Sequence, residues 1–298
     1  MGTASNSLAL VIVALFLTSL IMVSVPLIKS QPVGNIVINS DGSVAGTNSI
    51  QQVGNIYTLT ENISGNIQVQ KSNIILNGSG FALDGKGTGG IDLTNNIQHD
   101  YNNPAITNIT IENMYLKDGG IGTNGGGNNT FYNDFFSNCS RSQGGFAIQL
   151  LGCSYNNISY CNFDDESIVG MDYSANFNIV TNCNLPSNAG ILIWLSGSET
   201  VDKNYWSDYS SKYPNATEVD HSGVGNTPYV FLTLPNGAQP AVFQDNHPLM
   251  KPVTIPLMSS NPQTTVPEFS WLAILPLLFS MLFIAVILRQ RKPIYLKQ

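Results

Sequence analysis

The chain has 298 residues, of which 43% are hydrophobic and only 10% are charged, with a formal net charge of −7. This composition excludes a disordered chain, which would combine low hydrophobicity with high net charge. It also excludes a typical nucleic-acid-binding protein, because the body of the chain has no cluster of Lys and Arg that could neutralise phosphates. Asparagine (34 residues) and glycine (27 residues) supply much of the polarity instead.

The first 30 residues are predicted to be an export signal or an N-terminal anchor helix. Residues 8–25 are almost wholly apolar and are followed by Pro26 and Lys29. No Lys or Arg precedes this run, no Ala-x-Ala site follows it, and it is longer than the apolar part of most cleaved signals. Cleavage after Ser30 and retention as an anchor therefore stay open, and both place the following residues outside the cell.

Residues 34–209 consist of short apolar runs that have the length and alternation of β-strands, each opened by Asn and closed by a Gly or Asn turn. One unit recurs, with Asn at its start and a large hydrophobic residue at its end. Its ends are 20, 27, 22 and 21 positions apart, at Leu116, Phe136, Phe163, Leu185 and Trp206. A drifting period of this size, with strands and no helices, is typical of a solenoid.

We therefore predict an all-β fold, a parallel β-helix over residues 34–209. Stacked coils about 4.8 Å apart share a continuous core that one coil could not bury alone. Asn suits the corners, since it tolerates left-handed backbone and can hydrogen-bond the same residue in the next coil. At about 22 residues per coil the segment would form about seven or eight coils. Residues 84–104 interrupt the period and are predicted to form a lateral loop. A β-sandwich is the alternative, although it does not require the unit to recur.

The cysteines fall at positions related by the coil period. Cys139, Cys161 and Cys183 are 22 residues apart, so they could stack on one face. If the closing aromatic residues set the register instead, Asp134 takes the place of Cys139. Cys153 belongs to another face. Buried thiols and one disulfide between adjacent coils are both compatible with this spacing.

Acidic residues are densest at 164–166, with one more carboxylate a few positions later. Such a group can bind Ca²⁺ or act as an acid/base pair in polysaccharide cleavage, and a solvated turn is the structural alternative. Arg141 is the only Arg between residues 31 and 267, which disfavours a lyase with a cationic base. The candidate catalytic residues are Asp164, Asp165 and Asp172.

The most specific motif is Asn-Tyr-Trp-Ser-Asp-Tyr at 204–209, followed by Gly-Val-Gly-Asn-Thr-Pro-Tyr at 223–229 and Asp-Asn-His-Pro-Leu-Met at 245–250. In this order the three motifs closely resemble the C-terminal cap of NosD-type right-handed parallel β-helix proteins. That group includes periplasmic copper-binding proteins and archaeal surface proteins. The resemblance covers about residues 34–250 and implies a right-handed β-helix closed by a cap at 210–251.

The resemblance implies metal binding only weakly. Relatives carry an Asp-rich stretch suited to Ca²⁺ before the Gly-x-Gly segment, whereas this chain keeps only Asp220 there. His247 and Met250 are the only neighbouring ligands suited to copper, and two are too few. We expect no cofactor, with Ca²⁺ and copper as unsupported alternatives.

Aromatic residues of the cap could serve one of two purposes. An open β-helix end exposes unpaired backbone and core, so large rings can cover it. The same rings could instead stack on sugars. The residues concerned are Tyr205, Trp206, Tyr209 and Tyr229.

The C-terminal part is predicted to attach the protein to a membrane. Residues 252–269 are rich in Pro and read as an extended tether. Residues 271–288 are uncharged and long enough for a transmembrane helix, and the basic tail at 289–298 would be cytoplasmic. The Pro-Glu-Phe at 267–269, with the span and tail that follow, resembles the sorting signal of archaeal PEF-type surface proteins.

Seven Asn-x-Ser/Thr sequons fit an extracellular address and are candidates for glycosylation. They are Asn62, Asn77, Asn108, Asn128, Asn138, Asn157 and Asn215. The sequence thus predicts a non-catalytic, membrane-tethered cell-surface β-helix that contacts carbohydrate or surface-layer proteins and no nucleic acid. The alternatives are a carbohydrate-active enzyme and a copper-binding protein.

Overall fold

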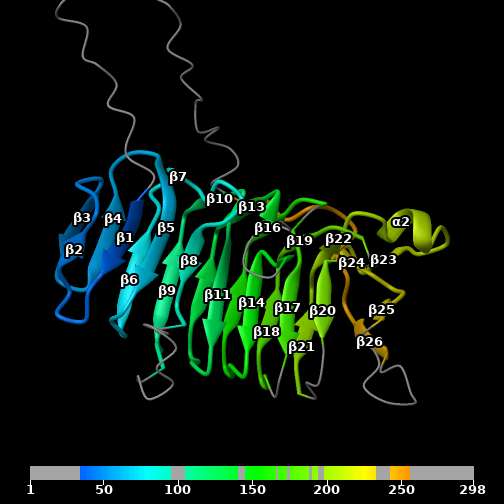
Figure 1. Ribbon diagram of the computed structural model, residues 1–298. Helices are drawn as coiled ribbons and strands as arrows, with labels where there is room; N and C mark the ends of the chain where they lie inside the picture. Colours follow the sequence, from blue (N-terminus) through cyan, green and yellow to red (C-terminus); the bar gives the residue numbers. More distant parts are fainter. Residues whose placement is uncertain are drawn as a thin grey trace, which may run out of the picture. The chain divides into compact units, whose positions relative to one another are not determined.

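The chain winds through up to three short strands per coil, and equivalent strands of successive coils pair in parallel (Figure 1). We call the three resulting sheets A, B and C. The computed structural model describes residues 34–94, 105–139, 145–165, 167–172, 175–187, 190–193, 198–232 and 242–255.

Each sheet is a column of strands that come from successive coils. Sheet B contains β4 (Ile56–Leu59), β6 (Ile74–Asn77), β9 (Ile109–Glu112), β12 (Thr130–Tyr132), β15 (Asn157–Ser159), β18 (Ile179–Thr181) and β21 (Thr200–Asp202). Sheet C contains β7 (Ala82–Asp84), β10 (Tyr115–Lys117), β13 (Phe135–Ser137), β16 (Asn162–Phe163), β19 (Asn184–Leu185) and β22 (Tyr205–Trp206). Sheet A contains β5 (Ile63–Val69), β8 (Gly90–Asp92), β11 (Gly120–Asn124), β14 (Ile148–Leu151), β17 (Val169–Asp172) and β20 (Ile191–Ile193).

Five coils carry one strand in each sheet, from β6–β8 to β18–β20, so the predicted parallel β-helix is confirmed. Before them β4 and β5 form a coil in which β5 pairs with both β7 and β8, and after them β21 and β22 form a partial coil. The expectation of seven or eight coils was too high. Coil lengths are uneven, because equivalent residues lie 35, 20, 27, 22 and 21 positions apart.

The closing hydrophobic residues set the register, as the recurring unit predicts. Leu116 pairs with Phe136, Phe136 with Phe163, and Leu185 with Trp206. The residues before these strands are thereby aligned as well, which places Asp134 rather than Cys139 in the column of Cys161 and Cys183. The open alternative for the cysteine stack is resolved in favour of the aromatic register.

Asparagine has two separate roles at the corner between sheets A and B. Asn73, Asn108 and Asn128 lie at successive coils with φ of 62°, 57° and 54°, so they make the left-handed turn. The residue that follows this turn is buried, and its side chain bonds the backbone of the preceding coil. The N–H of Ile109 donates to Asn129 Oδ1, that of Asn129 to Asn156 Oδ1, and that of Asn156 to Asn178 Oδ1, at 2.9 to 3.0 Å.

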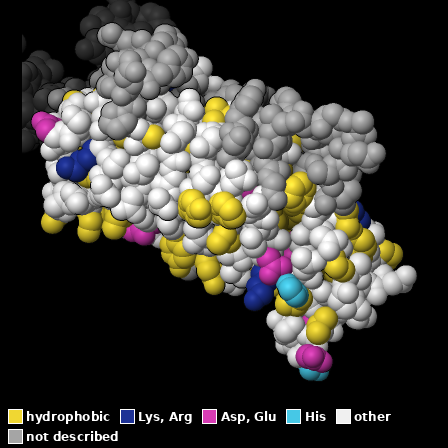
Figure 2. Space-filling model, turned by 90° about the horizontal axis from the view of Figure 1, so that it is seen from below, with side chains coloured by type: hydrophobic (Ala, Val, Ile, Leu, Met, Phe, Trp, Pro, Cys, Tyr) yellow, Lys and Arg dark blue, Asp and Glu magenta, His cyan; other side chains and the backbone are white. Residues whose placement is uncertain are grey.

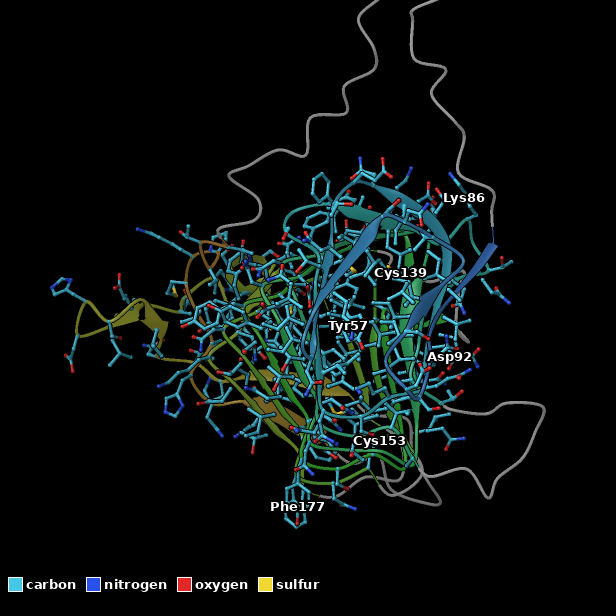
Figure 3. All side chains as sticks on the ribbon, turned by 90° about the vertical axis from the view of Figure 1, so that its left-hand side faces the viewer. Tyr57, Lys86, Asp92, Cys139, Cys153 and Phe177 are labelled. Atoms are coloured by element: carbon cyan, nitrogen blue, oxygen red, sulfur yellow. The ribbon has the colours of Figure 1, made fainter. Side chains whose placement is uncertain are left out.

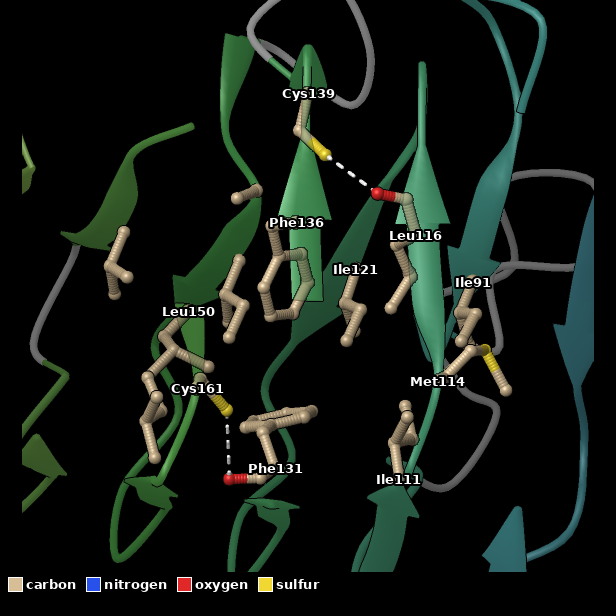
Figure 4. Packing of buried hydrophobic residues seen from close by; sticks show 14 of the residues in the cluster. Ile91, Ile111, Met114, Leu116, Ile121, Phe131, Phe136, Cys139, Leu150 and Cys161 are labelled. Atoms are coloured by element: carbon tan, nitrogen blue, oxygen red, sulfur yellow. Dashed lines mark hydrogen bonds between the residues drawn. The ribbon is translucent and has the colours of Figure 1, made fainter. Parts of the chain in front are cut away.

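The inward side chains of the three sheets form one continuous core of aliphatic, aromatic and sulfur-containing residues (Figure 4). Phe131 and Phe136 are fully buried, and Phe136 stacks on Phe163 with centroids 4.8 Å apart. Burial of each such side chain is worth about 1.5–3 kcal/mol, and stacking makes the gain depend on both neighbouring coils.

The N-terminal end of the core is covered by two antiparallel hairpins. β1 (Gly34–Ile38) pairs with β2 (Val44–Ala45), and β3 (Ile50–Val53) pairs with β4. Tyr57 is fully buried beneath them, and its hydroxyl donates to the carbonyl of Gly42 at 2.8 Å. β1 also pairs in parallel with β5 and so extends sheet A by one strand, but the first 20 described residues add no complete coil.

The C-terminal end is closed by α2 (Tyr209–Lys212) and two hairpins, β23 (Glu218–Val219) with β24 (Val224–Gly225), and β25 (Tyr229–Leu232) with β26 (Val242–Asp245). These elements follow β22 at the yellow and orange end of Figure 1.

Two sequence expectations need correction. The predicted lateral loop at 84–104 contains β8, which pairs in sheet A; the described part of the loop is the turn before it. The predicted tether at 252–269 begins with a docked segment, since Val253 bonds both side-chain atoms of Asn184 and Ile255 is buried.

The membrane predictions lie almost wholly outside the described residues. This holds for the signal or anchor at 1–30, the tether from residue 256, the span at 271–288 and the tail at 289–298. In the part of the chain that the structure describes, no helix is long and apolar enough to cross a membrane.

Candidate functional site

The three candidate catalytic aspartates do not converge. Asp164 follows β16 and holds the chain locally: its Oδ2 accepts the N–H of Asn138 (2.9 Å) and its Oδ1 accepts the hydroxyl of Ser167 (2.6 Å). Asp165 is an exposed turn residue beside it. Asp172 lies at the far end of β17, at the next corner of the coil.

Of the three weak metal candidates, His247 and Met250 make other contacts and Asp220 is exposed. His247 Nδ1 lies 2.8 Å from Asp202 Oδ1, whereas Met250 packs against the core and Asp220 is exposed in the β23–β24 turn. No group of three or more His, Cys, Asp or Glu that could hold a metal ion occurs among the described residues.

The cap aromatics close the solenoid. Trp206, Tyr209 and Tyr229 are buried, and Trp206 stacks on Tyr229 with centroids 4.2 Å apart. Trp206 Nε1 donates to Asp245 Oδ2 (3.1 Å), and only Tyr205 is half-exposed. Of the two roles predicted for these rings, the structure supports capping, because buried rings offer no face to a sugar.

Asp245 joins the cap to the last coil. Its two oxygens accept the backbone N–H groups of Lys203, Asn204 and His247 in addition to the indole of Trp206. Burial raises the pKa of Asp245, and these donors oppose that shift. In the same way, Asn204 Oδ1 accepts the N–H of Cys183 in the preceding coil (3.0 Å). Asp245 therefore continues into the cap the pattern in which a side-chain oxygen accepts a backbone N–H of the preceding coil.

All four cysteines are buried, and the structure forms no disulfide among the described residues. Cys161 and Cys183 are adjacent in one column, whereas Cys139 and Cys153 lie apart from them at other corners (Figure 3 labels these two). Burial raises the pKa of Cys139 to about 11 and raises the pKa of Cys161 well above its ordinary value. Buried thiols with a raised pKa are poor nucleophiles.

The feature that could not be read from the sequence is a set of two exposed aromatic pairs. One pair lies where the strands of sheet B begin and the other where they end. Tyr155 and Phe177 are 60% and 52% exposed and stack with centroids 5.2 Å apart. Tyr132 and Tyr160 are 40% and 38% exposed and meet edge to face at 5.6 Å. Figure 3 shows Phe177 projecting from the corner of the solenoid.

Three of these four aromatic residues sit in the left-handed backbone region. Tyr155 and Phe177, with φ of 61° and 57°, continue the column in which the preceding coils place Asn108 and Asn128. Tyr160 (φ 54°) takes the equivalent position at the other end of β15. For residues as bulky as these the left-handed region is a clear outlier. The sequence signal would have been an aromatic residue at a corner position otherwise filled by Asn, once the register is known.

An uncharged strip, which we call the sheet B face, runs from one aromatic pair to the other. It consists of the outward residues of β12, β15 and β18, namely Thr130, Tyr132, Asn157, Ser159, Ile179 and Thr181. On the two strands that flank this strip, the residues paired with Tyr132 and Thr181 are charged: Glu112 on β9 and Asp202 on β21. Figure 2 views the molecule from below, the side on which Phe177 projects in Figure 3, and shows hydrophobic side chains in groups there.

The comparisons with known proteins bear on the fold alone. No curated protein and no solved structure matches the chain. One family model does match: it is described as the right-handed beta helix region and covers residues 58–205. These limits run from within β4 to the start of β22. Over these residues the chain is therefore similar to the right-handed β-helix family.

Proposed function

We propose that the protein is a non-catalytic, cell-surface carbohydrate-binding β-helix whose ligand is an uncharged polysaccharide. The ligand contacts the sheet B face and the aromatic pairs at its two ends. The observation that carries the proposal is the stacked, exposed pair Tyr155–Phe177 on left-handed backbone.

The pair combines backbone strain with exposure to solvent. Left-handed backbone costs an L-residue about 1–2 kcal/mol, and Asn, which preceding coils use in the same column, pays less of it. Stacking of two rings contributes about 0.5–1.5 kcal/mol beyond the apolar area that it buries. Both rings also keep more than half of their surface in water. Strain with exposure of this kind is typical of a binding site, where the ligand supplies the missing contacts.

The chemistry of the face matches a sugar polymer. Aromatic rings stack on the apolar faces of sugar rings, while hydroxyl and amide groups exchange hydrogen bonds with sugar hydroxyls. The sheet B face offers these groups from Thr130, Asn157 and Thr181. From Tyr155 to Tyr160 the strand spans roughly 15 Å, which is room for several sugar units. A polyanion would be disfavoured by the net charge of −7.

The test is polysaccharide binding by the full-length chain and by the double variant Tyr155→Ala, Phe177→Ala, on a glycan array and by calorimetry. We expect a neutral polysaccharide to bind the parent chain and to bind the variant at least about tenfold more weakly, which corresponds to about 1.4 kcal/mol. Val219→Ala removes an exposed apolar side chain in the cap and should leave affinity unchanged.

Two outcomes would overturn the proposal. Equal affinity of the parent chain and the double variant would remove the aromatic corner from the site. Release of new reducing ends from the bound polysaccharide would make the protein an enzyme, and Asp165→Asn would then show whether the acidic turn is responsible. Binding confined to surface-layer proteins, with no glycan bound, would also contradict it.

A further inference from the structure

We propose that Asn62, Asn128 and Asn215 accept N-linked glycans and that the other four sequons do not. The inference rests on the cell-surface location in the proposed function. In the reaction, Nδ2 of Asn forms a bond to the anomeric carbon of an oligosaccharide carried by a lipid diphosphate. The bond from that carbon to the diphosphate oxygen breaks, the lipid diphosphate leaves, and Nδ2 loses one proton.

Three of the unmodified sequons direct Nδ2 at a neighbouring coil. Asn77 Nδ2 donates to Glu112 Oε1 at 2.7 Å, and Asn108 Nδ2 donates to Asn73 Oδ1 at 2.8 Å. Asn138 Nδ2 donates to Asp118 Oδ1. Glycosylation leaves one N–H on Nδ2, so a sugar there would have to fit beside an acceptor that this nitrogen already contacts on the neighbouring coil. Where the acceptor is a carboxylate, a hydrogen bond lost to this crowding is worth about 1.5–3 kcal/mol.

Asn157 is excluded for a different reason. It lies within β15 between Thr130 and Ile179 of the neighbouring strands, and its Oδ1 is buried. A glycan there would emerge from the middle of the sheet B face and cover it. An occupied Asn157 and polysaccharide binding at this face are therefore incompatible.

The three proposed acceptors have exposed side chains at turns. Asn62 Oδ1 accepts the N–H of Ala82 (2.8 Å), which anchors the oxygen and leaves Nδ2 on the other side of the planar amide. Asn128 follows Gly127 at a left-handed corner, and Asn215 follows Pro214 in the cap. No hydrogen bond of Nδ2 is formed by these three within the described part of the chain.

Asn128 has a further consequence for the binding site. It occupies the corner column of Tyr155, one coil before it, because its N–H donates to Ser154 O. Coils are about 4.8 Å apart, so a glycan on Asn128 would border the aromatic pair on its N-terminal side. The polysaccharide would then approach Tyr155 and Phe177 from the side of the later coils.

Glycopeptide mass spectrometry of the full chain, secreted by a host that transfers lipid-linked oligosaccharides, tests the inference. We expect glycan mass on the peptides of Asn62, Asn128 and Asn215 and unmodified peptides for the other four. Asn215→Gln and Thr217→Val should each remove the mass at Asn215 alone. A glycan on Asn77, Asn108, Asn138 or Asn157, or no glycan at any of the three acceptors, would overturn it.

A second measurement separates this inference from the proposed function. The triple variant Asn62→Gln, Asn128→Gln, Asn215→Gln lacks every proposed glycan but keeps the sheet B face. If it binds polysaccharide as the parent does while the glycans map elsewhere, only the acceptor assignment fails. If the glycans map as expected and neither protein binds polysaccharide, the proposed function fails and the acceptor assignment stands.

Discussion

Asp134 is a buried carboxyl group in the column that continues as Cys161, Cys183 and Asn204. Its Oδ1 accepts the N–H of Met114 (2.9 Å), just as Asn204 Oδ1 accepts the N–H of Cys183, while its Oδ2 is buried without a hydrogen-bond partner. Burial, and then the neighbouring Cys161, raise the pKa of Asp134 well above its ordinary value. The fold therefore favours the protonated acid at this position.

The raised pKa of Asp134 predicts a pH dependence of the free energy of unfolding that one substitution should weaken. Between the unfolded pKa, near 3.9, and the raised folded pKa, the folded state binds more protons than the unfolded state, so its stability falls as pH rises through this window. Asp134→Asn keeps the acceptor for Met114 and has no charge to lose. Urea unfolding at several pH values should show a shallower fall for this variant than for the parent.

The outcome is decided by comparison with two further variants. Asp134→Ala should lose about 1–3 kcal/mol at every pH, because the N–H of Met114 is left unpaired. Asp41→Asn, at an exposed turn where hydrogen bonds from Ser43 lower the pKa, should leave the fall with pH in place. A slope unchanged by Asp134→Asn would show that Asp134 is ionised in the folded protein.

The buried cysteines predict a second residue-scale result. Because burial raises the pKa of each of Cys139, Cys153 and Cys161, few thiolates exist at pH 8 in the folded protein. N-ethylmaleimide should label the native protein slowly and label four thiols once urea unfolds it without a reductant. Labelling of only two thiols in urea would instead identify a disulfide, for which the adjacent coils of Cys161 and Cys183 are the suitable place.

At the scale of elements, the buried Asn ladder fixes the corner between sheets A and B. Asn156 Oδ1 accepts the N–H of Asn129, and Asn156 Nδ2 donates to Asn178 Oδ1 (2.8 Å). Asn156→Ala breaks two links of the ladder and should cost about 1–3 kcal/mol or more in free energy of unfolding. Urea denaturation monitored by circular dichroism measures the loss.

The neighbouring Asn157 is a matched control for this prediction. Its Oδ1 is buried without a partner, so replacement by Val removes an unsatisfied polar atom and adds a residue that favours strands. Asn157→Val should therefore be neutral or stabilising. Equal losses for the two substitutions would mean that the ladder bonds contribute nothing specific.

How much of these elements could be predicted depends on which interactions are local. The recurring unit predicted the strands, the parallel stacking and the pairing of Phe136 with Phe163, because each coil repeats the same local pattern. The antiparallel pairing of β3 with β4 could not be predicted, because hairpin strands and coil strands show the same alternation of apolar and polar residues. The bond of Val253 to Asn184, 69 positions away, has no local signal either.

The candidate site was harder to predict than the fold, for a related reason. Tyr155 and Phe177 are 22 positions apart and look like two more aromatic residues of the core until the register turns them outward. The cap motif at 204–209 has three aromatic residues within six positions, but most of these rings are buried in the cap. Exposure is a property of the whole coil, so the binding role proposed for the pair depends on knowing the solenoid.

For the molecule as a whole, a solenoid whose coils contact only their neighbours should lose structure from a damaged end. Trp206 forms the joint between the last coil and the cap through its stack on Tyr229 and its bond to Asp245. Trp206→Ala should cost about 3–5 kcal/mol where the cap meets the coils. Hydrogen exchange followed by mass spectrometry should then show lost protection in β18–β22, with β6–β9 protected as in the parent. Tyr57→Ala, beneath the N-terminal hairpins, should reverse the pattern and deprotect β4–β6 first. Uniform loss of protection along the chain in both variants would instead show that the whole solenoid unfolds as one cooperative unit.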